Sequence, residues 1–179
     1  DDENEMFHHT SSMSEGVMHV PLEIVNPPEG FPETEERLFS QLDLRELLVR
    51  LATDDADYDD LLRDRVPAET VGLLGGENAT WDREFSAEEM AWWNRMIRCA
   101  YVDGTKRQWN SVGDAFEYRL DPDRPARQEL VDTGITIPDP DRRLFDESLE
   151  AFKEAAAAET QDAEFDAAVA DHLEQLGYL

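Results

Sequence analysis

The spacing of apolar side chains predicts two helices in the first part of the chain. Asp43 is a favourable N-cap residue, and Glu46 three positions later completes a capping box. The residues that follow place one apolar stripe on a helix face, formed by Leu44, Leu47, Leu48 and Leu51. Ser86 and Glu89 form a second capping box, which predicts a short helix through Trp93.

Three strands joined by tight turns are predicted in the middle of the chain. Residues 95–102 and 105–110 flank the pair Asp103–Gly104, which favours a two-residue hairpin turn. A further turn at Gly113–Asp114 leads into a third strand, whose alternating apolar side chains are Phe116, Tyr118 and Leu120. Strands joined this closely run antiparallel, so the pattern predicts a meander.

The segments around these elements give weaker patterns. Residues 1–16 are polar and are expected to be a loop, after which Leu22 and Ile24 predict a short strand that two prolines end. Residues 53–60 are expected to form a solvated acidic linker, and residues 124–140, with three prolines, a loop. Residues 61–85 carry no pattern that predicts an element.

Two more apolar stripes predict helices at the C-terminal end. The first consists of Leu144, Phe145, Leu149 and Phe152, and the second of Phe165, Val169, Leu173 and Leu176. Gly177 follows where a helix C-cap is expected. The tryptophans at positions 81, 92, 93 and 109 are expected to pack such helices against the sheet rather than to stack on a sugar.

The net charge of the chain indicates the salt conditions in which the protein folds. The 179 residues include 43 acids and 16 bases, a net charge of -27 that is spread along the whole chain. Such a charge repels itself in a compact fold, and molar salt, with a Debye length of about 3 Å, screens that repulsion. Only Lys106 and Lys153 are lysines. Acid excess with lysine depletion indicates a halophilic protein, and a merely acidic protein is the alternative.

Composition also excludes several classes of function. Nucleic-acid binding needs a basic surface, and anionic membranes would repel this chain, so neither partner is expected. No apolar run reaches the roughly 20 residues of a membrane-spanning helix. The single cysteine, Cys99, falls in a predicted strand and is expected to be a packed core thiol.

Five segments resemble a known family. They are His19–Ile24 with Pro27, Gln41–Leu48, Ile97–Tyr101 with Lys106–Trp109, Glu117–Asp123 and Leu173–Leu179. In this order they resemble the C-terminal third of the sulfatases, which are alkaline-phosphatase-like hydrolases. The segments are similar to that family's Val-Pro-Leu strand, Asp-Leu helix start, strand pair, Glu-Leu-Tyr-Asp-Leu signature and ending. Arg119 departs from the signature, where aspartate is usual.

The resemblance implies an α/β fold in two parts. Residues 1–60 would be the end of the large α/β domain of an alkaline-phosphatase-like sulfatase fold. Residues 61–179 would form a small C-terminal α+β subdomain, with an antiparallel sheet and a terminal helix. Without the rest of the large domain, an exposed apolar patch is expected around Leu22, Ile24, Leu44 and Leu48.

The family's chemistry is metal-dependent hydrolysis of a sulfate ester, with a phosphate or phosphonate ester as alternative substrate. It uses a Cys/Ser-x-Pro-x-Arg nucleophile motif and a Ser-Asp-His-Gly-Glu metal motif, neither of which occurs in this sequence. The resemblance places the metal motif just before Asp1, so we expect the chain to be a C-terminal fragment that is inactive alone. A divalent metal, calcium by resemblance, would be bound by the full-length parent and not by this chain alone.

One catalytic candidate is within the chain. In the family, a histidine in the loop before the Val-Pro-Leu strand faces the sulfate and can protonate the leaving oxygen, and His9 stands at about that place. Histidine suits this role because its pKa lies near working pH. The alternative is that His8 and His9 are a solvated loop pair.

A non-enzymatic function is the alternative to hydrolysis. An independent acidic protein of a halophile could serve as an interaction module or as a mimic of DNA. This second hypothesis leaves the five ordered segments unexplained. The cytoplasm is the default expectation for the compartment, since any export signal would precede Asp1.

Overall fold

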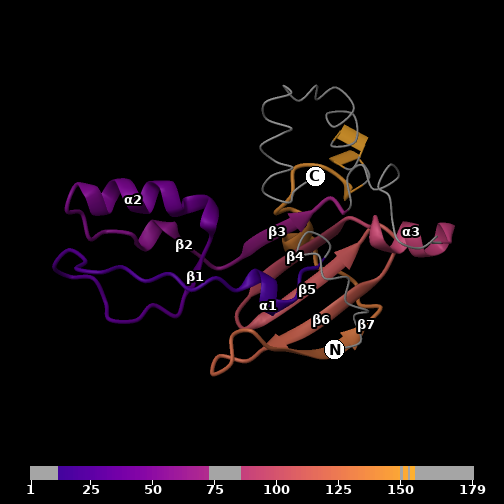
Figure 1. The fold of residues 1–179 in the computed structure, drawn as a ribbon, viewed down its shortest axis with the longest axis horizontal. Helices are drawn as coiled ribbons and strands as arrows, with labels where there is room; N and C mark the ends of the chain where they lie inside the picture. Colours follow the sequence, from indigo (N-terminus) through magenta and orange to yellow (C-terminus); the bar gives the residue numbers. More distant parts are fainter. Residues whose placement is uncertain (1–11, 73–85, 150, 153, 156–179) are drawn as a thin grey trace, which may run out of the picture.

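A computed structural model of the protein describes residues 12–72, 86–149, 151–152 and 154–155. It is a mixed α/β structure with two antiparallel sheets and few helices. The smaller sheet pairs β1 (Leu38–Phe39) with β2 (Leu62–Arg63). Helix α2 (Leu44–Ala52) lies with this sheet, to one side of the larger sheet (Figure 1).

The larger sheet has five strands in sequence order. They are β3 (Val66–Thr70), β4 (Ile97–Val102), β5 (Thr105–Asn110), β6 (Ala115–Leu120) and β7 (Gln128–Thr133), and every neighbouring pair is antiparallel. Helix α3 (Ala87–Trp93) precedes β4, and the short α4 (Asp139–Arg142) follows β7. The predicted meander is therefore confirmed as the centre of this sheet (Figure 1).

Local turn and cap chemistry acts as the sequence predicts at two places. Asp103 and Gly104 both have positive φ, 46° and 71°, which is the backbone of a type I′ turn and matches the twist of the hairpin β4–β5. Ser86 and Glu89 form the predicted capping box, with each side chain bonded to the other residue's backbone N–H. Strand β4 begins at Ile97, two residues later than predicted.

Both faces of the larger sheet are covered at β4, whereas the edge strand β7 is largely exposed. On one face, Met96, Ala100, Trp109 and Ala115 are buried with Ile137 and Leu149, and Leu144, Phe145 and Phe152 pack against them. On the other face, Ile97 and Cys99 are buried with Met13, and Met18 packs against this group. Met18 ends α1 (Glu15–Met18), a single helical turn. Strand β4 is thus buried from both sides, by two segments that flank the sheet in sequence.

Several sequence expectations need correction. Residues 22–25 form no strand, because no strand within the described part of the chain pairs with them and Leu22 stays exposed. Residues 124–140 are not only loop: they contain β7 and the start of α4. Residues 1–16, expected to be loop, include the start of α1 at Glu15. The unassigned residues 61–85 supply β2 and β3, both of which need tertiary pairing to form.

The helix α2 is confirmed, but its predicted capping box is wrong. The Asp43 side chain makes no cap bond and instead accepts two hydrogen bonds from Arg63, at 2.7 Å and 2.6 Å. Ser40 caps the preceding 3-10 turn η2 (Gln41–Asp43) by accepting from the Leu42 N–H. A tertiary ion pair has therefore displaced the local cap.

The C-terminal stripes are only partly within the described residues. Leu144 and Phe145 lie in the turn after α4 rather than in a helix, yet both pack on the core as expected. Leu149 and Phe152 are helical. The second stripe, from Phe165 to Leu176, lies outside the described residues, as does Gly177. Within the described part of the chain, no helix is long and apolar enough to cross a membrane.

Candidate functional site

The most deeply buried polar group of the described residues is the ammonium of Lys106. Lys106 lies on β5, opposite Tyr101 of β4 and Tyr118 of β6, and its side chain is 0% exposed. Its Nζ donates to the Met13 carbonyl, to Glu15 Oε1 at 2.9 Å and to Gln128 Oε1. An ammonium has three N–H donors, so this site satisfies each of them.

Glu15 completes the charge balance of this cluster. It is also buried, and its Oε1 accepts a second hydrogen bond from the Tyr101 hydroxyl at 2.8 Å. Burying one charge alone costs several kcal/mol, and a paired, hydrogen-bonded partner offsets that cost. The rings of Tyr118 and Tyr101 lie 5.3 Å and 5.8 Å from Nζ, close enough for a cation–π contribution.

The neighbouring thiol and phenol are held neutral. Burial raises the pKa of Cys99 to about 12, and burial with the nearby Cys99 and Glu15 raises the pKa of Tyr101 as well. Cys99 is 0% exposed, so it is a packed core thiol, as the sequence predicts, and cannot act as a nucleophile in this state. The cluster around Lys106 has no accessible reactive group, and its geometry suits anchoring rather than catalysis.

A second buried ionic group covers the opposite face of the sheet. Asp141 of α4 accepts from Arg107 Nη1 at 2.8 Å and from Arg65 Nε at 3.1 Å. Arg107 also donates to Glu117 at 2.8 Å, and hydrogen bonds with Asp141 and Glu117 raise its pKa. The two bonds of Asp141 tie α4 to β5 and to Arg65, which directly precedes β3.

Arg98 anchors the segment after α4 in the same way. Its Nε donates to Glu69 at 2.9 Å and its Nη1 to the Glu147 carbonyl at 2.7 Å. The guanidinium also stacks over Phe145, 4.4 Å from the ring centre. Arg98 and Arg107 are therefore committed to protein carboxylates and are not positioned as receptors for a sulfate group.

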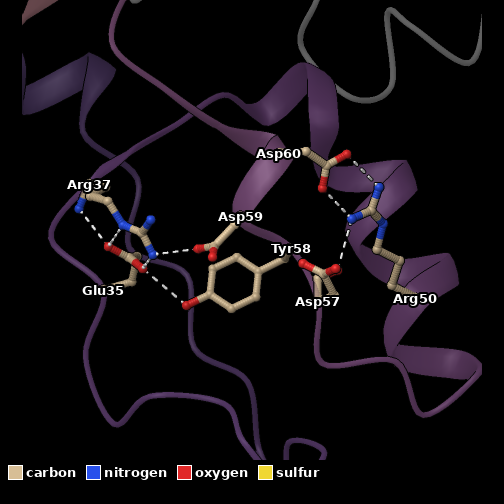
Figure 2. A network of polar contacts seen from close by, with 7 residues as sticks. All are labelled: Glu35, Arg37, Arg50, Asp57, Tyr58, Asp59 and Asp60. Atoms are coloured by element: carbon tan, nitrogen blue, oxygen red, sulfur yellow. Dashed lines mark hydrogen bonds and ion pairs between the residues drawn. The ribbon is translucent and has the colours of Figure 1, made fainter.

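A third polar network holds the smaller sheet to its loops (Figure 2). Arg37 bonds Glu35 at 2.7 Å and Asp59 at 2.9 Å, and the Tyr58 hydroxyl donates to Glu35 at 3.0 Å. The hydrogen bond from Arg37 lowers the pKa of Glu35 to about 2. Phe31 stacks on Tyr58 with ring centres 4.6 Å apart.

The other half of this network is centred on Arg50 of α2. Its guanidinium bonds both carboxylate oxygens of Asp60, at 2.5 Å and 2.9 Å, and donates to the Asp57 carbonyl at 2.8 Å (Figure 2). The acidic stretch 53–60 is therefore not a free solvated linker, as expected from sequence. The carboxylates of Asp59 and Asp60 pair with Arg37 and Arg50, and the stretch ends in the 3-10 turn η3 (Asp59–Leu61).

The described residues bring together no metal centre. No group of three or more His, Cys, Asp or Glu side chains among them could hold an ion. His9, the one catalytic candidate, and its neighbour His8 lie outside the described residues. Trp81 does too, whereas Trp109 packs edge-on against Phe145 in the core as predicted.

Sequence reasoning missed Lys106 and Glu15 as a site. The sequence predicts a loop around Glu15, and it marks Lys106 as part of a strand pair and as one of two lysines. The composition carries one signal. In a chain with fourteen arginines and two lysines, a lysine indicates a site whose geometry fits an ammonium better than a guanidinium. Comparisons with models of protein families, with curated proteins and with solved structures find no match for this chain.

Proposed function

We propose that this chain is the C-terminal part of a sulfatase-like hydrolase of a halophile. In the parent protein it would contribute the rim of the substrate cleft and His9, which would protonate the leaving oxygen of the ester. The divalent metal, calcium by resemblance, and the nucleophile would come from outside this sequence. The reaction would be hydrolysis of a sulfate ester, or alternatively of a phosphate or phosphonate ester.

The observation that carries the proposal is the apolar surface of residues 17–49. Seven large apolar side chains there are exposed: Val17, Val20, Leu22, Val25, Leu42, Leu48 and Val49. Two of them, Leu22 and Leu48, belong to the patch that the resemblance predicts, and the other two members, Ile24 and Leu44, are half-buried. Where exposed apolar residues gather on one surface, another part of a protein typically covers them. A large α/β domain would be that cover.

The ordered segments give further support. The second one spans η2 and the start of α2, the third covers the hairpin β4–β5, and the fourth runs along β6 into the turn at Asp121. These three segments thus coincide with defined elements, whereas the first, His19–Ile24, forms no strand and the fifth, Leu173–Leu179, lies outside the described residues. The resemblance implies an antiparallel sheet with a terminal helix for the C-terminal subdomain, and the five-stranded sheet agrees with the first part of this expectation.

The first experiment is to read the coding sequence upstream of the Asp1 codon. An open frame encoding Ser-Asp-His-Gly-Glu and, further upstream, Cys/Ser-x-Pro-x-Arg supports the proposal. The protein of that frame should hydrolyse an aryl sulfate or a phosphate ester at molar salt, and a chelator should abolish the activity. A stop codon directly upstream contradicts it, and the acidic interaction module then becomes the function to test.

A second experiment tests His9 in that longer protein. His9→Gln keeps the size of the side chain but removes the titrating group, so kcat should fall about 10²-fold or more while binding of the ester is kept. His8→Gln is the matched control, because it makes the same change one residue away. If both substitutions leave kcat unchanged, both histidines belong to the solvated loop pair.

A further inference from the structure

Lys106 occupies a cradle that fits an ammonium ion. Its three donors meet three acceptors: Met13 and Glu15 belong to one segment, and Gln128 begins β7. A guanidinium is planar, larger and carries five donors, so arginine would leave some of them unsatisfied in a site that is 0% exposed. This explains why a lysine stands here in a chain that otherwise uses arginine almost throughout.

The segment that Lys106 holds has little structure of its own. Helix α1 is a single turn of four residues, and its N-cap Ser14 makes no side-chain cap bond. An isolated helical turn is unstable in water, so the place of α1 depends on tertiary contacts. The polar contacts are those of Lys106 and Tyr101 with Glu15, and the apolar contacts join Met13 to Ile97 and Cys99.

We propose that Lys106 is a positioning residue, which seats the segment Met13–Met18 on the sheet and so fixes the point from which the preceding residues depart. Those residues include His9, four positions before Met13 in the sequence. The catalytic part of this inference rests on the proposed function. The seating of the segment stands on the contacts of Lys106 alone.

The reactivity of Cys99 reports directly on whether the segment Met13–Met18 stays on the sheet. It is the only cysteine of the chain and lies buried beneath Met13. If the segment lifts, the thiol meets solvent and its reaction with a small maleimide accelerates. Lys106→Met removes the ammonium at similar length and leaves Glu15 buried without its cation. We expect the rate of Cys99 modification to rise at least about tenfold at molar salt, through local opening.

Two further variants make the test specific. Glu15→Gln keeps an acceptor oxygen and the side-chain shape, so it should accelerate modification less than Lys106→Met does. Arg119→Met removes a base on the neighbouring strand, where Arg119 is exposed and pairs with Glu129, and should react like the wild type. Amide exchange separates opening from unfolding: peptides covering residues 13–18 should lose protection, while those covering residues 105–110 should keep it.

An unchanged Cys99 rate in folded Lys106→Met overturns the seating role, and so does an equal loss of protection in both sets of peptides. If Lys106→Met does not fold, Glu15→Gln carries the same comparison. In the longer protein, Glu15→Gln should lower kcat for the ester about tenfold with KM unchanged, because a misplaced acid affects the transition state. A faster Cys99 reaction with unchanged kcat overturns the positioning role. If the wild-type longer protein has no esterase activity, the proposed function is wrong. The reaction rate of Cys99 still tests whether Lys106 holds the segment Met13–Met18 on the sheet.

Discussion

The two sheets of this protein are held together by different forces. The five-stranded sheet has apolar cores on both faces, and Met96, Ile97, Cys99 and Ala100 in or beside β4 are almost fully buried. In the smaller region, formed by β1, β2 and α2, only Leu47 and Leu61 are buried among the large apolar residues of residues 38–63. Its other contacts are largely arginine–carboxylate pairs at the surface (Figure 2).

This difference implies different stabilities for the two regions. Burial of apolar surface contributes roughly 25 cal/mol per Å², whereas a solvent-exposed ion pair adds little and is screened by salt. The five-stranded sheet can therefore be stable by itself. The smaller region leaves Leu48 of α2 exposed, and under the proposed function a further domain would cover it and add stability.

The largest contrast should come from apolar truncations in the two regions. Met96 is 0% exposed and Leu48 is 56% exposed. Met96→Ala should lower the free energy of unfolding by about 2–5 kcal/mol, because it leaves a cavity in the sheet's core. Leu48→Ala should change it by about 0.5 kcal/mol or less. Urea unfolding of both variants at molar salt measures the contrast, and similar costs would contradict it.

The same two variants also test the proposal that a further domain covers α2. In the longer protein, Leu48→Ala should become destabilising, because the side chain would then leave a cavity in an interface. Met96→Ala should cost the same in both proteins, since its surroundings lie within the five-stranded sheet.

A smaller effect is expected from the buried carboxylate Asp141. Asp141→Asn keeps one acceptor oxygen but loses the charge that binds Arg65 and Arg107, at a cost of about 1.5–3 kcal/mol. The matched control is Asp59→Asn in the smaller region. The Asp59 side chain is 76% exposed and pairs with Arg37 at the surface, so no measurable loss is expected. Thermal unfolding at molar salt compares the two variants. A greater loss of stability for Asp59→Asn than for Asp141→Asn would contradict the view that the surface ion pairs contribute little.

The smallest effect concerns the pH dependence of the smaller region. Folding lowers the pKa of Glu35 from 4.5 to about 2, chiefly through the hydrogen bond from Arg37. The pair therefore stabilises the fold above about pH 4.5, and this contribution is lost as the pH falls toward about 2. The difference in unfolding free energy between wild type and Glu35→Gln should shrink from about pH 6 to about pH 3. A difference that does not change with pH would show that the pair is not formed in solution.

Much of the central sheet could be predicted from the sequence. The turn at Asp103–Gly104 and the alternation of Phe116, Tyr118 and Leu120 place three consecutive strands, and the Ser86–Glu89 box places α3. Strands β3 and β7 could not be found in this way. Residues 129–133 of β7 are all exposed, so they carry no buried face that would produce an alternating pattern.

The candidate site residues also differ in whether the sequence predicts them. His9 follows from resemblance and stays a prediction, because it lies outside the described residues. The role of Lys106 does not follow from its sequence neighbours, since the acceptors of its hydrogen bonds lie 93, 91 and 22 positions away. The Asp43 cap failed for a related reason, as Arg63 competes for the carboxylate that would have capped α2.

The sequence by itself determined the features whose partners lie within a few residues. A capping box spans three residues and a type I′ turn needs two residues that tolerate positive φ, so both are local free-energy minima that the fold retains. Only the tertiary structure decided that Lys106 meets Glu15, 91 positions away, and that Asp141 meets Arg65, 76 positions away. Such pairs form because a charge that folding removes from water must find its counter-charge, and the strand register determines which one is within reach.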